Sequence, residues 1–379
     1  MRALIVEDGR SRGALAACRA LAEAGWSVGV ACPGGSGLAA RSSRCAEAFD
    51  VPAFRGDADS FVADVANVAA HGRYEIVFGT GDADILALSA ARDRLPCTFP
   101  YPPHEVLLEC MDKLALTRAA ESHGLAVPHT ASPSSDSWEP PVVVKPRLHW
   151  TPSSTGGQTR FEATLARTRG EVEAAIATAR QSGSEPILQE VVHGRLMACG
   201  LVADSGGRIL ALVQQVADRT WPPAAGVSCR AHTVSPDDEL VAGIGSLLRD
   251  LGWSGLAQMQ FIVPQAGAPK LVDMNGRFYG SLSLAVAAGC NLPDLWARQS
   301  LGRQIGATPP PAIGVRYQWV EGDLRRAFTE RRGNLLQDLA GTLAYGRGAT
   351  HSIWAIRDPR PAVHHIRSLL HRSIRKVSR

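Results

Sequence analysis

The sequence predicts a mixed protein that is α/β in its first part and α+β further along. In residues 1–103, short apolar strands alternate with helical stretches, as where "RALIVED" precedes the Ala-rich run "SRGALAACRALAEAG". That alternation is typical of a parallel, doubly wound domain. Later, "GLAQMQFIVPQAGAPKLVDMNGR" (255–277) places two apolar strands around a loop with Pro and Gly, which predicts a β-hairpin.

Composition sets the broad class of the chain. It has 379 residues, a formal charge of +4, 45% apolar residues and 20% charged residues. These values fit an ordinary soluble globular protein of two or three domains, and so small a charge gives no reason to expect a nucleic-acid partner. The eight cysteines are scattered without a C-x-x-C pair, which argues against a structural zinc site or a disulfide framework.

The termini and hydropathy bear on localisation. "MRALIVEDGR" runs directly into a strand without a hydrophobic signal core. No stretch approaches the roughly 20 apolar residues of a membrane span. We therefore expect a reduced, cytoplasmic protein without a transmembrane segment, and a homodimer remains open.

The first strand–helix turn, "VEDGRSRG", lacks the G-x-G-x-x-G spacing of a dinucleotide-binding turn. Independent NAD binding is therefore not expected. A scaffold, or part of a substrate pocket at the strand ends, is the better interpretation.

The middle of the chain alternates helices and strands around one long loop. Residues 111–123 predict a helix that Gly124 ends, with Pro128 beyond it. A strand follows at 142–145, and then a Ser/Thr/Gly-rich loop at 146–159 whose length is typical of functional loops. Further helices are expected at 169–182 and 237–251, and strands at "PILQEVVHG", "MACGLVAD", "ILALVQQVAD" and "GVRYQW".

The predicted hairpin has an unusual polar face. In an extended strand alternate side chains share a face, so Asp273, Asn275 and Arg277 point the same way. If 264–269 is the loop, Val263 lies opposite Lys270, and counting outward brings further polar residues together. Those pairs are Gln260 with Asp273 and Gln258 with Asn275.

Such polar groups are costly inside a protein unless they have partners. A metal ion that bridges phosphates would be one partner, and a hydrogen-bonded structural cluster is the alternative.

The chain resembles the ATP-grasp ligases, and more narrowly the carboxylate–amine ligase branch related to carbamoyl-phosphate synthetase and biotin carboxylase. The resemblance rests on the N-terminal domain, "MDKLALTRAAESHGLAVPHT", "VVVKP", the Gly-rich loop, "LQEVV", "AQMQF" and "DMNGRFYGS", in the family's order. It implies a Rossmann-like pre-ATP-grasp domain (1–105) and a two-lobed ATP-grasp domain (106–305, small lobe and lid about 124–190). A C-terminal extension (306–379) follows.

For the nucleotide, the resemblance implies that Lys113 and Lys145 contact phosphates, with Lys145 also near the adenine edge. A lysine among valines would otherwise be a poorly placed charge, although a solvated lysine is the alternative. The loop that would fold over the phosphates contains Ser153, Ser154, Thr155, Gly156 and Gly157, and a plain surface loop is the alternative. The adenine hinge would contain Gln189, Glu190 and Val192. No ribose-binding carboxylate follows the hinge.

For the metal, the resemblance makes Gln260, Asp273 and Asn275 the ligands of one or two Mg²⁺ ions, with Mn²⁺ as another candidate. The family usually has Glu where this chain has Asp273, and Pro is common where it has Gly276. Arg277 would face the γ-phosphate and then the acyl phosphate, so Arg277 and Lys145 are the catalytic candidates.

For the substrates, Arg230, Ser281 and Arg316 are the candidates. An arginine can pair with a carboxylate, although a lone loop arginine is often merely solvated. Ser281 would cap a helix whose free N–H groups could hold an anion.

The resemblance implies ATP-dependent amide formation through an acyl phosphate, with release of ADP and phosphate. The substrates would be a small carboxylate and an amine acceptor, amino-acid-like compounds of a biosynthetic pathway. Two alternatives remain open. One is acyl transfer to a thiol, a carrier protein or another macromolecule, and the other is a non-catalytic nucleotide-binding regulator. The basic amphipathic tail "AVHHIRSLLHRSIRKVSR" would touch a membrane surface or a partner, or pack on its own protein.

Overall fold

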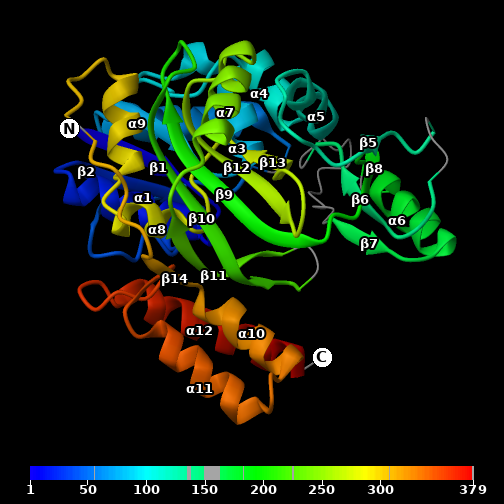
Figure 1. Ribbon diagram of the computed structural model, residues 1–379. Helices are drawn as coiled ribbons and strands as arrows, with labels where there is room; N and C mark the ends of the chain where they lie inside the picture. The colour runs from blue at the N-terminus through cyan, green and yellow to red at the C-terminus, as the bar shows by residue number, and fades with distance from the viewer. Residues whose placement is uncertain are drawn as a thin grey trace.

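The computed structural model describes residues 1–54, 56–134, 138–148, 163–181, 183–223, 226–306 and 308–377, with side chains described as far as residue 371. Within these residues the strands form three β-sheets. Figure 1 shows the smallest lobe projecting to one side of the central sheet and the C-terminal helices lying below that sheet. None of the helices in the described ranges combines the length and apolar content that a bilayer crossing requires.

The N-terminal sheet has the order β3-β2-β1-β4, and all its strand pairs are parallel. Helices connect its strands because parallel neighbours need a crossover. Side chains cap two of these helices, Ser11 at Ala14 N–H and Asp57 at Ser60 N–H. The elements are β1 (Arg2–Val6), α1 (Arg12–Glu23), β2 (Ser27–Cys32), η1 (Pro33–Gly35), β3 (Cys45–Asp50), α2 (Ala58–His71), β4 (Ile76–Gly79), α3 (Asp82–Ala90) and η2 (Arg92–Arg94).

Two helices lead into the small lobe. The helix predicted at 111–123 begins only at Lys113, because Asp112 leaves the helical conformation and caps it, and Met111 ends a separate helix. Gly124 ends that helix with a φ of 74°, as its C-cap position predicts. The elements are α4 (His104–Met111), α5 (Lys113–Ser122), β5 (Thr130–Ala131), β6 (Val142–Pro146), β7 (Thr164–Ala166), α6 (Arg169–Gln181) and β8 (Pro186–Glu190). The strands pair in the order β5-β8-β6-β7, all antiparallel.

The central sheet has seven strands in the order β13-β12-β9-β10-β11-β14-β15. Its core hairpins are antiparallel, and β9 and β10 flank the predicted turn at 205–207. The elements of this part are β9 (Gly194–Ala203), β10 (Ile209–Trp221), β11 (Val227–Val234), α7 (Asp238–Asp250), β12 (Gly255–Pro264), β13 (Lys270–Asn275), α8 (Leu282–Ala287) and α9 (Leu292–Ser300).

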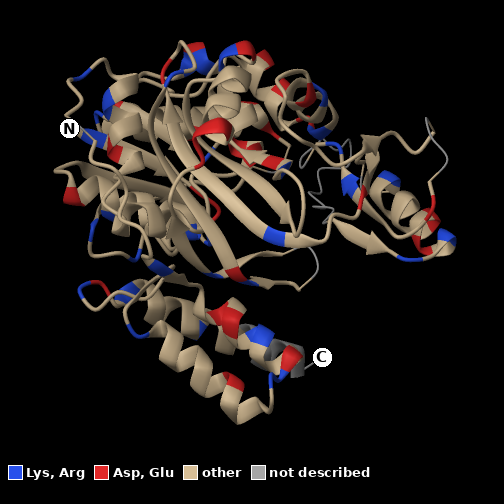
Figure 2. Ribbon diagram, viewed as in Figure 1, with Lys and Arg blue, Asp and Glu red and all other residues tan. Residues whose placement is uncertain are grey.

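The C-terminal residues are part of this sheet. Strand β14 (Arg316–Gln318) pairs with β11, and β15 (Ala349–His351) pairs with β14. The expected extension at 306–379 therefore contributes two strands, together with α10 (Val320–Glu330), α11 (Leu335–Gly346) and α12 (Arg360–Val377). Figure 2 shows charges of both signs interspersed over the surface, while α11 is almost free of them.

Aromatic packing joins the N-terminal sheet to the central one. Phe78 on β4 lies 5.1 Å from Phe278 and 4.7 Å from Trp296 between ring centroids. Phe278 directly follows Arg277, and both Phe78 and Phe278 are almost fully buried. The apolar contact therefore fixes the backbone beside Arg277 against the N-terminal domain.

Candidate active site

The β12–β13 hairpin brings the predicted polar pairs together. Gln260 lies opposite Asp273, and Gln258 lies opposite Asn275, as the sequence predicts. The register nearer the loop differs, because Ile262 and not Val263 pairs with Lys270. The irregularity falls between the pairs Gln260–Asp273 and Phe261–Leu271, so β13 carries one extra residue there. The bulge shifts the loop end of the hairpin and leaves the polar pairs in register.

Amide side chains continue from this hairpin into the protein. Gln260 Nε2 donates to Gln258 Oε1 over 3.2 Å, and Gln258 Nε2 donates to Ser281 Oγ over 3.3 Å. Gln215 on β10 is also within 3.0 Å of that hydroxyl. Ser281 stands at the N-cap position of α8 without capping it, because its hydroxyl serves these glutamines. The cap predicted for Ser281 is therefore wrong.

Lys113 is held at the start of α5 by its neighbours. Asp112 accepts the N–H groups of Leu114 and Ala115 and also pairs with Arg147 at 2.7 Å. Lys113 N–H donates to the Arg147 carbonyl over 3.1 Å. The ammonium of Lys113 is buried, forms no hydrogen bond within the described part of the chain, and lies 4.0 Å from Asp273 Oδ1.

A buried ammonium that has only one distant ion pair and no hydrogen bond among the described residues is costly. This position beside Asp273 is therefore suited to a ligand that supplies anionic oxygens.

Lys145 lies on β6 at the other side of the same region. Its Nζ donates to Gln189 Oε1 over 2.6 Å, and Gln189 Nε2 donates to Thr130 Oγ1 over 2.9 Å. Burial lowers the pKa of Lys145 to about 8, with Asp273 opposing the shift and Lys113 adding to it. Both lysines therefore lie within electrostatic range of Asp273.

The expected adenine hinge lies at the end of β8. Gln189 turns its side chain toward Lys145, and Glu190 forms an ion pair with Lys270 of β13. Glu190 N–H donates to the His129 carbonyl over 2.9 Å. Val192 follows the strand and is partly buried. The lid residues Ser153, Ser154, Thr155, Gly156 and Gly157 lie outside the described residues.

Arg277 reaches the N-terminal domain. Its Nε donates to Asp82 Oδ1 over 2.5 Å, at the first residue of α3. Nearby, burial raises the pKa of Asp84 to about 7, and Asp8 and Asp82 raise it further, while Arg277 opposes the shift. Acidic residues after β4 thus lie beside Arg277, and Asp8 after β1 lies within electrostatic range of Asp84. Asp82 is not among the site residues predicted from the sequence, although "GTGDAD" at a strand–helix turn is a signal for such a cluster.

Two of the predicted substrate residues, both arginines, form hydrogen bonds to other parts of the protein, away from the hairpin. Arg230, expected in a loop, lies on β11, where Nε donates to Asp323 Oδ2 over 2.7 Å and Nη2 to Thr342 Oγ1 over 3.0 Å. Arg316 donates to the Arg347 carbonyl over 2.6 Å at the far edge of the sheet. These contacts attach the C-terminal helices and the far edge of the sheet, so neither placement supports a substrate role.

A tryptophan explains the glycine in "DMNGR". A Cβ at Gly276 would stand 2.0 Å from Cη2 of the buried Trp253. Any larger residue, the usual proline included, would collide with the indole ring. Glycine in place of the proline common in the family is therefore explained by Trp253, whose indole fills the space beside position 276. The polar face of the hairpin is unaffected.

The donor set fits Mg²⁺. Within the described residues no group of three His, Cys, Asp or Glu is placed to hold a metal, so the candidate ligands are one carboxylate and two amides. The Asn275 amide forms no hydrogen bond in the described part of the chain, and Asp273 faces the open ammonium of Lys113. Gln260, Asp273 and Asn275 would hold the ion, because Mg²⁺ takes oxygen ligands from few protein groups and completes its shell with phosphate and water.

Comparisons with known proteins agree with this geometry. Residues 167–323 match the family described as "ATP-grasp in the biosynthetic pathway with Ter operon", a segment that contains the hairpin and Arg277. No curated protein sequence matches the chain.

Solved structures share the fold at low sequence identity. The L-amino acid ligase of Bacillus licheniformis is 14% identical, with a TM-score of 0.61, over 82% of this chain and 77% of that one. The biotin carboxylase domain of Hydrogenobacter thermophilus 2-oxoglutarate carboxylase, solved with MgADP, ADP and bicarbonate, is 14% identical with a TM-score of 0.63 over 83% and 73%. N5-carboxyaminoimidazole ribonucleotide synthetase from Thermus thermophilus is 18% identical, with a TM-score of 0.59, over 83% and 81%. The chain therefore has the fold of these solved structures, and its residues 167–323 are similar to an ATP-grasp family.

Proposed function

We propose that the protein is an ATP-dependent carboxylate–amine ligase that acts through an acyl phosphate. The observation that carries the proposal is the meeting of Asp273, from the β12–β13 hairpin, with the ammonium of Lys113 from α5 at 4.0 Å. Around that contact lie Lys145 and the polar residues Gln260 and Asn275. Such a cluster of cations and oxygen ligands suits the triphosphate of ATP with its metal.

In the proposed reaction a carboxylate oxygen attacks the γ-phosphorus of ATP, and ADP leaves. The amine then attacks the acyl carbon, loses a proton, and expels phosphate, which carries away that carboxylate oxygen. Bound Mg²⁺ would neutralise charge on the phosphates. Lys113 and Lys145 hold the phosphates, and Arg277, fixed by Asp82, stabilises the transferred phosphoryl group.

The test supplies MgATP with a library of carboxylates and amines, and measures ADP, phosphate and the amide product. With an ¹⁸O-labelled carboxylate, the released phosphate should gain one labelled oxygen. Asp273→Ala should lower turnover by at least about 100-fold, whereas Asp238→Ala, an exposed acid at the start of α7, should not. Formation of AMP and pyrophosphate, or unlabelled phosphate, would contradict the acyl-phosphate route.

A further inference from the structure

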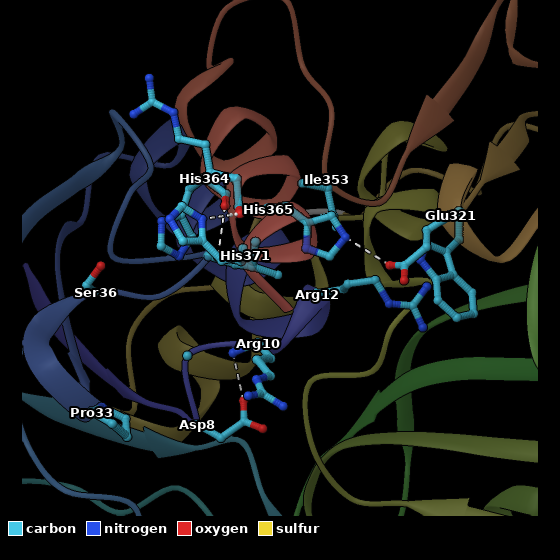
Figure 3. A pocket seen from close by; sticks show the side chains of 15 residues that line it. Asp8, Arg10, Arg12, Pro33, Ser36, Glu321, Ile353, His364, His365 and His371 are labelled. Atoms are coloured by element: carbon cyan, nitrogen blue, oxygen red, sulfur yellow. Dashed lines mark hydrogen bonds and ion pairs between the residues drawn. The ribbon is translucent and has the colours of Figure 1, made fainter. Parts of the chain in front are cut away.

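A cavity of about 760 Å³ lies between the N-terminal domain and the C-terminal helices. Its walls come from the β1–α1 turn, the stretch after β2, and helices α10 and α12 (Figure 3). This volume is within the range of small-molecule sites. The sequence turn "VEDGRSRG" therefore lines a pocket at the end of a parallel strand.

The lining is rich in cations that have no acidic partner. The side chains of Arg10 and Arg367 form no ion pair or hydrogen bond in the described part of the chain. Arg12 is held differently, because its Nη1 donates to Tyr317 Oη over 3.1 Å and its guanidinium lies 4.0 Å from the centre of the Trp319 ring. Neither contact neutralises its charge.

The two acids of the lining do not cancel these charges. Glu321 is already paired, with His365 at 2.9 Å and with Arg325 at 2.5 Å. Asp8 lies beside Arg10 (Figure 3), where it accepts the backbone N–H of Arg10 over 2.8 Å and forms no ion pair with an arginine side chain within the described residues. Burial lowers the pKa of His364, with Arg41 and His365 acting in the same direction, so this histidine adds little positive charge.

The cavity lies next to the segment that follows Arg277. Asp8 at its edge and Asp82, the partner of Arg277, both act on the pKa of Asp84. On the other side, a Cβ at Gly280 would stand 2.8 Å from Arg12 Nη2, and Tyr317 Oη donates to the Gly280 carbonyl over 2.9 Å. Arg277 and the segment that follows it therefore separate the cavity from the hairpin.

We infer that this cavity binds the anionic end of a small organic substrate, a carboxylate or phosphate group that Arg10, Arg12 and Arg367 hold while the reacting end lies toward Arg277. That an anion binds here is inferred from the cavity alone. That the bound molecule is a substrate rests on the proposed ligase function. Leu38 and Ile353 supply an apolar wall for the body of such a molecule. Arginines suit this task because their planar guanidinium groups match both carboxylate and phosphate oxygens.

The experiment screens full-length protein, without Mg²⁺ or nucleotide, against matched pairs of probes. Sugar phosphates are paired with their parent sugars, and di- and tricarboxylic acids with their amides, so the two arms separate phosphate from carboxylate recognition. Anions should raise the Tm and their uncharged analogues should not. For the best anion, the Arg10→Ala/Arg367→Ala double variant should bind at least about tenfold more weakly by calorimetry.

Two controls locate the binding. Arg360→Ala removes an exposed arginine of α12 outside the cavity and should leave the Kd unchanged. Lys113→Met impairs the proposed phosphate site and should also leave it unchanged. The inference is overturned if no anion binds, if uncharged analogues bind equally well, or if Lys113→Met abolishes binding while the double variant retains it.

The substrate role has a separate readout. The bound anion, supplied with MgATP and an amine or carboxylate partner, should stimulate ADP release, and the double variant should raise its KM while leaving the Kd of ATP unchanged. Binding in the cavity without such stimulation would remove the substrate role. Absence of ATP cleavage with any compound would contradict the ligase function. The binding data would still show whether the cavity binds an anion.

Discussion

Arg277 Nε donates to Asp82 Oδ1 over 2.5 Å and so joins two residues that lie 195 positions apart. The bond connects the segment after the β12–β13 hairpin to the first residue of α3. Both side chains are mostly buried, with about a fifth of each exposed. A guanidinium fixed in this way is preoriented, because its rotation is restricted before any ligand binds.

The first prediction concerns this pair. Asp82→Ala should lower kcat by about 10- to 100-fold, because Arg277 loses its orientation, while the Kd of ATP changes little. Steady-state kinetics and calorimetry would measure the two effects. Asp93→Ala, an exposed acid of the same domain, is the matched control. A changed Kd with an unchanged kcat would show that Asp82 does not act through Arg277.

The register of the hairpin shows which cross-strand pairs can be predicted from the sequence. Period-two alternation and a loop rich in Pro and Gly were enough to pair Gln260 with Asp273 and Gln258 with Asn275. The same counting failed at Lys270, because it assumed a symmetric loop and could not anticipate a bulge in β13. Bulges depend on how the strand bends to meet its neighbours, which is information from the tertiary structure.

The substrate candidates show that the sequence does not reveal the distant partners of a charged residue. Arg230 and Arg316 are isolated positive charges in the sequence, and their acceptors at Asp323 and Arg347 lie 93 and 31 positions further along. A motif cannot identify such distant partners. Asp82 was missed for the same reason, because its importance comes from Arg277. Short motifs located the phosphate and metal candidates, whereas ion pairs between distant segments required the fold.

The second prediction uses the open ammonium of Lys113. Lys113→Met should raise the free energy of unfolding of the ligand-free protein by about 1–3 kcal/mol, because the buried ammonium forms no hydrogen bond within the described residues and its ion pair with Asp273 is long, at 4.0 Å. The same variant should lose most of the stabilisation that MgATP gives to the wild type. Urea unfolding with and without nucleotide would measure both effects.

A residue that serves binding should show two opposite effects when it is replaced: the ligand-free protein becomes more stable, and nucleotide binding becomes weaker. Lys270→Met is the control, because Lys270 is already paired with Glu190 and should not gain stability. If Lys113→Met destabilises the ligand-free protein and leaves nucleotide binding unchanged, Lys113 has a structural role in this fold.

The third prediction concerns Gly276 and Trp253. Gly276→Ala should cost about 1–3 kcal/mol of unfolding free energy, because the new methyl group would meet the indole ring at 2.0 Å. In a Trp253→Val background the same substitution should cost much less. A double-mutant cycle by urea unfolding measures this coupling. Equal costs in the two backgrounds would mean that backbone conformation, and not the indole, requires glycine here.

The fourth prediction follows from the lowered pKa of Lys145. Burial brings that pKa to about 8. At pH 8, with no ligand bound, Lys145 is therefore neutral in about half of the molecules. A triphosphate beside it favours the charged form and raises its pKa. Nucleotide binding at pH 8 should therefore take up about half a proton, and affinity should fall as pH rises above 8 while changing little below 7.

Calorimetry in two buffers of different ionisation enthalpy measures that proton uptake. Lys145→Met should remove it and should bind nucleotide more weakly at pH 7, where the wild-type ammonium is charged. Lys270→Met keeps Lys145 and should retain the uptake. The same shift acts on stability, because between pH 8 and the ordinary pKa of lysine the unfolded chain holds a proton that the folded ligand-free protein lacks. Stability therefore rises with pH across that window. Proton release on binding, or uptake that persists in Lys145→Met, would show that another group titrates and that the phosphates do not reach Lys145.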